Sequence, residues 1–224
     1  MHSVLSARSL VKHFHEPETF RVLDDISLDV ASGEFLSIVG KSGSGKTTLL
    51  YVLSTMDTDF EGDLVIKGQN LRGSDRRQLA AFRNENIGFV FQFHYLLPEF
   101  TARDNVMLPA MKLGRQSKDE IRAYADELLD AVGLRGQEDK QATKLSGGQQ
   151  QRVAIARSMI NNPAIIMGDE PTGNLDTKNT HMVFDILQEL TRSRGQTIVT
   201  VTHDPEFSSR CDRIIELEDG RVLS

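Results

Sequence analysis

The sequence predicts an α/β fold in which a mostly parallel sheet with flanking helices carries an N-terminal antiparallel β subdomain and an inserted α-helical subdomain. The first observation is a glycine-rich run at residues 40–47, between a short apolar segment and the start of a helix-like segment. The second is that strand-like segments fill the first third of the chain and helix-like segments its middle. The third is that the two kinds alternate after residue 164. Such alternation is typical of a parallel sheet with helical crossovers.

Short apolar or alternating runs bounded by turn residues predict five strands in the first part of the chain. The third of these strands runs into the glycine-rich loop, and a helix is expected to begin at Thr47. The expected strands cover residues 3–14, 22–30, 35–39, 62–67 and 87–91.

The clearest helix pattern lies in the middle of the chain. Between residues 117 and 132, apolar side chains recur three and four positions apart, as on one face of a helix. Ser117 and Glu120 form a capping-box pattern at its start, and Gly133 stands where the helix should end. We therefore expect a helical insertion at about residues 93–160.

After this insertion the chain is expected to return to the sheet. The expected elements are a strand at 164–167, a helix at 178–190, strands at 197–202 and 213–217, and a turn at 219–220 into a short strand at 221–222. The chain then forms one domain, whose core combines about residues 1–92 and 161–224.

Length and composition fit a single globular domain. The 224 residues can bury a sizeable core, and 39% hydrophobic with 26% charged residues is ordinary for such a protein. No apolar run is long enough to span a membrane, and the first residues lack the apolar stretch of a secretory signal. A net charge of −6 disfavours nucleic acid as a partner, because nucleic-acid phosphates bind cationic surfaces. The single cysteine, Cys211, fits a reducing compartment and is interpreted as a packing residue, with a reactive thiol as the alternative.

The glycine-rich run fits the phosphate-loop pattern G-x-x-x-x-G-K-[ST] at every fixed position. Its glycines let successive backbone N–H groups converge on phosphate oxygens, and the helix that follows adds its dipole. Lys46 is expected between the β- and γ-phosphates, and the Thr47 hydroxyl on Mg²⁺. The chain is therefore predicted to have a P-loop NTPase core that binds a nucleoside triphosphate. The expected nucleotide contacts are Gly40, Lys41, Ser42, Gly43, Ser44, Gly45, Lys46, Thr47 and Thr48.

A second motif, Leu145-Ser-Gly-Gly-Gln149, opens another expected helix, so that a hydroxyl, N–H groups and the helix dipole suit a phosphate. This run resembles the signature sequence of ATP-binding cassette (ABC) ATPases, and the other motifs follow in the order of that family. The resemblance implies ATP and Mg²⁺ as ligands and a homodimer that encloses two ATP molecules. It also implies that the signature contacts the γ-phosphate bound by the partner chain through Leu145, Ser146, Gly147, Gly148 and Gln149.

An apolar strand that ends in two carboxylates, Asp169 and Glu170, is similar to a Walker B segment of this family. Ligands of open α/β sheets collect at the carboxyl ends of the strands, and the phosphate loop lies there too. Asp169 is expected to hold Mg²⁺ through water. Glu170 is expected to act as the base that orients and polarises the attacking water.

Further positions of the site follow from the resemblance alone. Gln92 matches the glutamine that senses Mg²⁺ and the γ-phosphate, and is counted with Thr47 and Asp169 as a metal contact. His203 matches the switch histidine that hydrogen-bonds the γ-phosphate. Phe14 falls where the family stacks an aromatic ring on adenine, with a core aromatic as the alternative. The D-loop, which crosses to the partner chain, is matched by Asn174, Leu175 and Asp176.

The segment after Gln92 is rich in aromatic and apolar residues. In ABC transporters this region receives a helix from the membrane subunit, and a chain without a predicted span requires a separate permease. Phe93, His94 and Tyr95 are expected at that interface, where aromatic residues are favoured. For Leu96 and Leu97, an interface position and a place in the subdomain core are equally open.

Two longer runs, residues 91–106 and 168–176, are most similar to the ATPase subunits of lipoprotein-releasing (Lol-type) complexes. The resemblance implies a peripheral ATPase on the cytoplasmic face of the inner membrane that powers lipoprotein release by ATP-driven dimerisation. Three alternatives stay open. Two are near relatives, the macrolide-export (MacB-type) and the cell-division (FtsE-type) ATPases. The third is a DNA-repair ABC ATPase, which would need coiled-coil insertions or basic surfaces that this sequence lacks.

Overall fold

The computed structural model describes residues 3–15 and 18–223 and contains two sheets. The six-stranded sheet has the order β10-β9-β3-β8-β7-β6, with β10 antiparallel to β9 and the other neighbours parallel. Its strands are β3 (Phe35–Val39), β6 (Ile87–Val90), β7 (Ile165–Asp169), β8 (Thr197–Val201), β9 (Arg213–Glu218) and β10 (Arg221–Val222). The four-stranded sheet is antiparallel, with the order β2-β1-β4-β5. Its strands are β1 (Ser3–Phe14), β2 (Phe20–Ala31), β4 (Glu61–Ile66) and β5 (Gln69–Asn70). The predicted α/β class, with a mostly parallel sheet and an antiparallel β subdomain, is confirmed.

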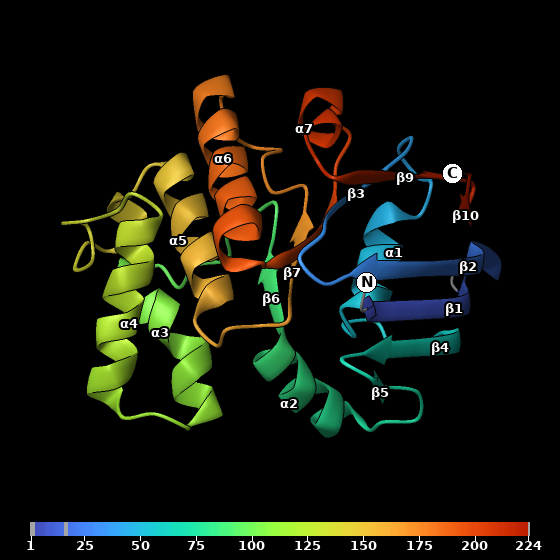
Figure 1. Ribbon diagram of the computed structural model, residues 1–224, viewed down its shortest axis with the longest axis horizontal. Coiled ribbons are helices and arrows are strands. Elements are labelled where there is room, and N and C mark those ends of the chain that lie inside the picture. Colours follow the sequence, from blue (N-terminus) through green and yellow to red (C-terminus); the bar gives the residue numbers. More distant parts are fainter. Residues whose placement is uncertain (1–2, 16–17, 224) are drawn as a thin grey trace.

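Helices flank the larger sheet and form a separate cluster at one end of the molecule (Figure 1). In the view of Figure 1, helices α3, α4 and α5 lie at the left and the four-stranded sheet lies at the right. The helices are α1 (Lys46–Leu53), α2 (Arg76–Asn86), α3 (Ala102–Leu113), α4 (Lys118–Ala131), α5 (Gly147–Met159), α6 (Thr177–Arg194) and α7 (Pro205–Ser209), with a 3₁₀ turn at Ala142–Lys144. None of them, over the ranges described, is long and apolar enough to cross a membrane.

Two apolar clusters hold these parts together. One packs α1 between the antiparallel sheet and the larger sheet, and includes Leu10, Leu49 and Met167. The other joins α3, α4, α5 and α6 to the opposite face of the larger sheet. There the ring of Phe35 stacks on Phe184 at 5.6 Å between centroids. The larger sheet is therefore buried on both faces, as its nearly continuous apolar strands require.

Most element boundaries agree with expectation to within a few residues, and the differences have local causes. Strand β4 ends at Ile66 because Lys67 has a φ of 52° and begins a turn. Strand β7 continues through Asp169, so one of the two expected carboxylates lies in the strand itself. Helix α6 extends to Arg194, where Gly195 ends it in the left-handed conformation that glycine adopts readily.

Helices α2 and α3 were not specified by the sequence patterns. Each begins with a capping box, formed by Asp75 and Gln78 in α2 and by Thr101 and Asp104 in α3. Helix α2 is largely polar and buries few side chains, so it shows no apolar stripe. Helix α3 contains Pro109, a residue that usually ends a helix pattern.

Candidate nucleotide site

The phosphate loop connects β3 to α1 and has the strand–loop–helix setting that the sequence predicts. Gly40 has a φ of 149°, and a Cβ built there would lie 2.1 Å from the carbonyl oxygen of Leu217, so no side chain fits. Gly45 starts α1 in the left-handed conformation, with a φ of 98°. The Lys46 ammonium donates hydrogen bonds to the carbonyl oxygens of Gly40 and Lys41, both at 2.8 Å. The backbone carbonyl groups of the phosphate loop therefore enclose the Lys46 ammonium.

A cavity of about 380 Å³ opens beside this loop. Its walls come from the phosphate loop, from the β1–β2 hairpin and from the ends of β7 and β8. The lining residues are Phe14, Phe20, Val22, Ser42, Gly43, Gly45, Lys46, Thr47, Thr48, Glu170 and His203. The volume and the mixture of backbone amides, one cation and two aromatic rings suit a nucleoside triphosphate.

Thr47 and Asp169, which lie 122 residues apart in the sequence, meet at the floor of the site. The Thr47 hydroxyl donates to Asp169 Oδ1 at 3.1 Å. Burial raises the pKa of the Asp169 carboxyl, an effect that the Thr47 hydrogen bond opposes. A buried carboxylate beside a hydroxyl is the hard oxygen donor set that Mg²⁺ takes, and a cation there would stabilise the ionised carboxylate. The residues therefore fit a magnesium ion.

Glu170 and His203, which both line this cavity, form a pair. Nδ1 of His203 lies 2.8 Å from Oε1 of Glu170. Glu170 has a φ of 47°, which is uncommon for a residue with a side chain, and its N–H donates to the carbonyl oxygen of Val201. This backbone turns the carboxylate out of β7 toward the histidine. The histidine is largely exposed, so its remaining ring nitrogen is accessible to a ligand.

Two aromatic rings, those of Phe14 and Phe20, line one part of the cavity, and the sequence analysis predicted only Phe14. Phe14 is 39% exposed and Phe20 is 52% exposed, and their ring centroids are 5.7 Å apart. The two residues pair across β1 and β2 at the end of the hairpin. The sequence analysis missed Phe20 because it lies two residues before the expected strand 22–30, whereas β2 begins at Phe20. Its cross-strand position opposite Phe14 is the signal that could have found it.

Gln92 and Lys41 do not join the residues that line the cavity. A Cβ built at Gly173 would lie 3.0 Å from Nε2 of Gln92, so the amide packs beside the segment after β7. The carbonyl oxygen of Gln92 accepts a hydrogen bond from Asn174 Nδ2 at 3.2 Å. The Lys41 side chain is highly exposed and forms an ion pair with Glu218 at 3.0 Å. The side chain of Lys41, an expected nucleotide contact, is therefore directed to the Glu218 carboxylate of β9.

The signature residues lie at the start of α5, away from the phosphate loop of the same chain. Ser146 and Gln149 form a reciprocal capping box, with hydrogen bonds of 3.3 and 3.0 Å. A Cβ built at Gly147 has no neighbour within 4 Å, so this helix end is open. Gly148 instead packs against the Asn179 side chain, and Leu145 is buried. None of residues 145–149 is among the residues that line the cavity beside the phosphate loop.

Two residues of the predicted D-loop, Leu175 and Asp176, make contacts within the same chain. Leu175 packs against the apolar cluster of α3 to α6. Asp176 caps α6 by accepting from the backbone N–H of Asn179 at 2.8 Å. Hydrogen bonding to Asn179 holds the pKa of Asp176 below its usual value. Any contact of this loop with a second chain therefore starts from a firmly held backbone.

The segment expected to contact a permease is partly exposed and is held by an arginine. Phe93 and Tyr95 are 60% and 64% exposed, and Leu97 is also exposed. Leu96 is half-buried and packs against the core cluster, whereas Leu97 does not; an interface role for either leucine stays a prediction. Arg157 of α5 donates to the carbonyl oxygens of His94 and Tyr95, both at 2.8 Å. Burial lowers the pKa of His94, and the charge of Arg157 lowers it further.

Comparison with known proteins gives one consistent result. The family model described as "ABC transporter" matches residues 23–173. The lipoprotein-releasing system ATP-binding protein LolD of Bordetella pertussis is 45% identical over 219 residues, which cover 97% of this chain and 94% of that protein. LolD of Leptospira interrogans is 44% identical over 224 residues, with 100% and 92% coverage. The dimeric, post-hydrolysis cassette MJ0796 bound to ADP and Pi has a TM-score of 0.90 and 38% identity, with 98% and 97% coverage.

Proposed function

This chain belongs to the ABC transporter ATPase family, and we propose that it is the ATPase subunit of a complex that releases lipoproteins from the inner membrane. As a member of this family it binds nucleotide and hydrolyses ATP. The lipoprotein assignment is supported by similarity to LolD proteins from several bacteria over nearly the whole chain. The observation that carries the ATPase chemistry is the Glu170–His203 pair facing the phosphate loop across one cavity.

In the proposed site, the backbone amides of residues 40–47 hold the phosphate chain of ATP. Lys46 exchanges its two carbonyl partners for the β- and γ-phosphates, which are stronger acceptors. Thr47 and Asp169 would hold Mg²⁺, Asp169 through water, and Gln92 would sense the metal and the γ-phosphate. Mg²⁺ bound there would neutralise charge that develops on the phosphate oxygens.

Glu170 is the proposed general base. Its carboxylate accepts the proton of the attacking water and fixes the direction of attack on the γ-phosphate. His203 holds Glu170 in place through Nδ1 and is aimed with its other ring nitrogen at the γ-phosphate. Donation from Nδ1 to Glu170 and from Nε2 to the γ-phosphate at the same time requires the imidazolium form, which carries hydrogen on both ring nitrogens.

The proposed working unit is a homodimer. Signature residues 145–149 form an open helix end at Gly147 but do not line the phosphate-loop cavity of their own chain. A second copy, placed head to tail, brings them onto the γ-phosphate and encloses one ATP at each of two shared sites. The likeness to the dimeric MJ0796 cassette supports this arrangement.

A separate membrane subunit is the proposed partner, with this chain bound peripherally on the cytoplasmic side of the inner membrane. Its docking site includes the exposed Phe93, Tyr95 and Leu97, together with the half-buried His94 and Leu96. The helical subdomain at about residues 93–160 carries this face and the signature, so that motion of one moves the other.

The proposed function is tested by expressing the tagged chain from its native gene neighbourhood and purifying it in detergent. Recovery of a membrane subunit, together with ATP-dependent release of a lipoprotein from reconstituted vesicles, supports the proposal. A complex that hydrolyses ATP but moves another cargo would contradict the lipoprotein assignment and keep the ATPase assignment.

A further inference from the structure

A buried glutamine of α5, Gln151, joins three parts of the candidate site. The residue is 1% exposed. Its Nε2 group donates to the carbonyl oxygen of Pro171 at 2.5 Å and to that of Phe91 at 3.4 Å. Pro171 directly follows Glu170, and Phe91 directly precedes Gln92. One amide, on the helix that begins with the signature, therefore bonds to the backbone beside each of these two residues.

The partners fix the orientation of this amide. Two carbonyl oxygens approach the same end of the side chain, and only the NH2 group of an amide can donate to both. The other end, Oε1, is buried and has no hydrogen-bond partner among the described residues. Burial of an unpaired amide oxygen costs free energy that an apolar side chain of the same size would not. The two N–H donors are therefore the part of Gln151 that an apolar residue could not replace.

Two other amide side chains are buried within residues 3–15 and 18–223, and both are paired at each end. Asn105 accepts from the N–H of Leu97 and donates to the carbonyl oxygen of the same residue. Asn86 accepts from Lys67 and donates to a backbone carbonyl oxygen of α2. Gln151 differs from both in its unpaired oxygen, and in donor bonds that reach the ends of two neighbouring strands, β6 and β7.

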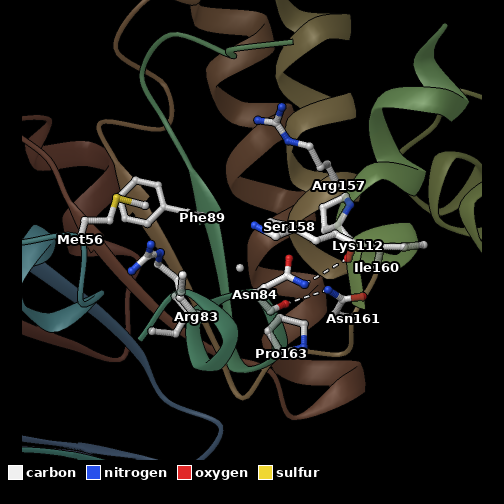
Figure 2. Close-up of a pocket in the computed structure, with 14 residues that line it drawn as sticks. Met56, Arg83, Asn84, Phe89, Lys112, Arg157, Ser158, Ile160, Asn161 and Pro163 are labelled. Carbon is white, nitrogen blue, oxygen red and sulfur yellow. Dashed lines mark hydrogen bonds between the residues drawn. The ribbon is translucent and has the colours of Figure 1, made fainter. Parts of the chain in front are cut away.

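The packing of α5 on β6 holds Gln151 in this place. At the other end of the contact, Gly88 of β6 is so close to α5 that a Cβ built on it would lie 2.2 Å from the carbonyl oxygen of Ser158. Ser158 lines a cavity of about 210 Å³, beside which Asn161 donates to the carbonyl oxygen of Asn84 (Figure 2). Helix and strand are thus in direct backbone contact near the start of β6.

The spacing along the two elements agrees with a continuous contact. Ser158 and Gln151 are two turns apart on α5, a rise of about 10.5 Å. Gly88 and Phe91 are about 10 Å apart along an extended strand. The helix therefore runs antiparallel along β6, with Ser158 near the start of the strand and Gln151 at its carboxyl end.

We infer that Gln151 is a positioning residue for ATP hydrolysis, which holds the backbone beside Glu170 and beside Gln92 in a fixed relation to the signature helix. Glu170 has a left-handed φ of 47°, and its carboxylate contacts His203. The bond from Gln151 to the next residue, Pro171, stabilises the turn that sets this direction. This inference rests on the proposed function, because it takes Glu170 as the general base.

The test compares variants of the full chain with ATP and Mg²⁺, at chain concentrations that support dimerisation. Gln151→Met keeps the size of the side chain but removes both N–H donors. Its single-turnover hydrolysis rate is expected to fall about ten- to a hundredfold, because the base loses its alignment. The dissociation constant for ATP should change less than about twofold, since Gln151 is not among the residues that line the nucleotide cavity.

Gln196→Met is the matched control. Nε2 of Gln196 also donates to two carbonyl oxygens, those of Pro163 and Thr197, both at 3.2 Å. These bonds lie at the amino ends of β7 and β8, whereas Glu170 follows the carboxyl end of β7. This variant should keep its hydrolysis rate. All variants are assayed at a temperature at which their melting curves show them folded.

A double-mutant cycle separates positioning from a general effect on the fold. In Glu170→Gln the base is absent, so adding Gln151→Met should lower the remaining rate less than about twofold. Gln151→Glu, which keeps the shape of the side chain, takes the place of Gln151→Met where that variant melts early. The same results are expected of it: a large loss alone and a small loss together with Glu170→Gln.

The failures are distinguishable. An unaltered rate in Glu170→Gln overturns the proposed role of the base, and this inference with it. A large loss in Glu170→Gln with an unaltered rate in the Gln151 variant overturns this inference alone. An equal fractional loss with and without the Glu170 carboxylate also overturns it, because Gln151 then does not act through the base. So does an equal loss in Gln196→Met.

Discussion

His203 Nδ1 lies 2.8 Å from Glu170 Oε1, and the two residues come from the ends of adjacent parallel strands, β7 and β8. Glu170 reaches this position with a left-handed φ of 47°. The contact removes freedom from the carboxylate before nucleotide binds, so that its orientation toward a water molecule is already set. In the proposed ATPase reaction, the geometry of this catalytic pair is built into the edge of the sheet.

The first prediction concerns Glu170, the proposed general base. Glu170→Gln keeps the shape of the side chain but cannot accept a proton, so the hydrolysis rate should fall about a hundredfold or more. ATP binding should persist, and the variant should accumulate as an ATP-bound dimer. Single-turnover hydrolysis and size-exclusion chromatography with ATP and Mg²⁺ measure both effects. A variant that stays monomeric and retains its rate would remove Glu170 from this role.

The second prediction concerns the shared site. Lys46→Ala removes the ammonium that the phosphate loop encloses, and should abolish nucleotide binding by that chain. Ser146→Arg should leave nucleotide binding intact but block the signature. Mixing the two variants restores at most one composite site, so ATPase activity should reach no more than about half that of the unaltered dimer. Full activity of unaltered chains diluted to monomers would contradict the shared site.

A third prediction concerns Phe14 and Phe20, the two aromatic rings proposed to contact adenine. Phe20→Ala should weaken ATP binding about two- to tenfold, similarly to Phe14→Ala, because each ring contributes stacking surface. Binding of tripolyphosphate, which has no base, should be unchanged in both variants. Equilibrium titration with ATP and with tripolyphosphate gives the comparison. Equal losses for the two ligands would show that Phe20 acts on the loop and not on the base.

The fourth prediction concerns Cys211. Burial raises the pKa of this thiol to about 12, so at pH 8 the native protein holds it as the unreactive neutral thiol. Labelling by a disulfide reagent at pH 8 should be at least about a hundredfold slower in native buffer than in urea, where the pKa returns to its ordinary value. Rapid labelling of the native protein would instead support the reactive-thiol alternative.

The sequence by itself determined the parts whose chemistry is local. The phosphate loop needs glycine at Gly40 and Gly45 because their backbone angles exclude other residues, and the pattern of residues 40–47 states this directly. The capping box of Ser146 and Gln149 is likewise set by residues three positions apart. The role of residues 93–97 at a membrane subunit is not local in this sense and stays a prediction.

Only the tertiary structure decided what distant residues do together. Phe20 lies opposite Phe14 at the end of the β1–β2 hairpin, a contact that the sequence analysis did not predict, because the two strands pair in one particular register. Arg83 has no part in the sequence analysis, and only the packing of α2 against β6 and α3 leaves it half-buried, with no carboxylate partner among the described residues. Desolvation and pairing depend on which segments surround a group, and local sequence patterns do not contain that information.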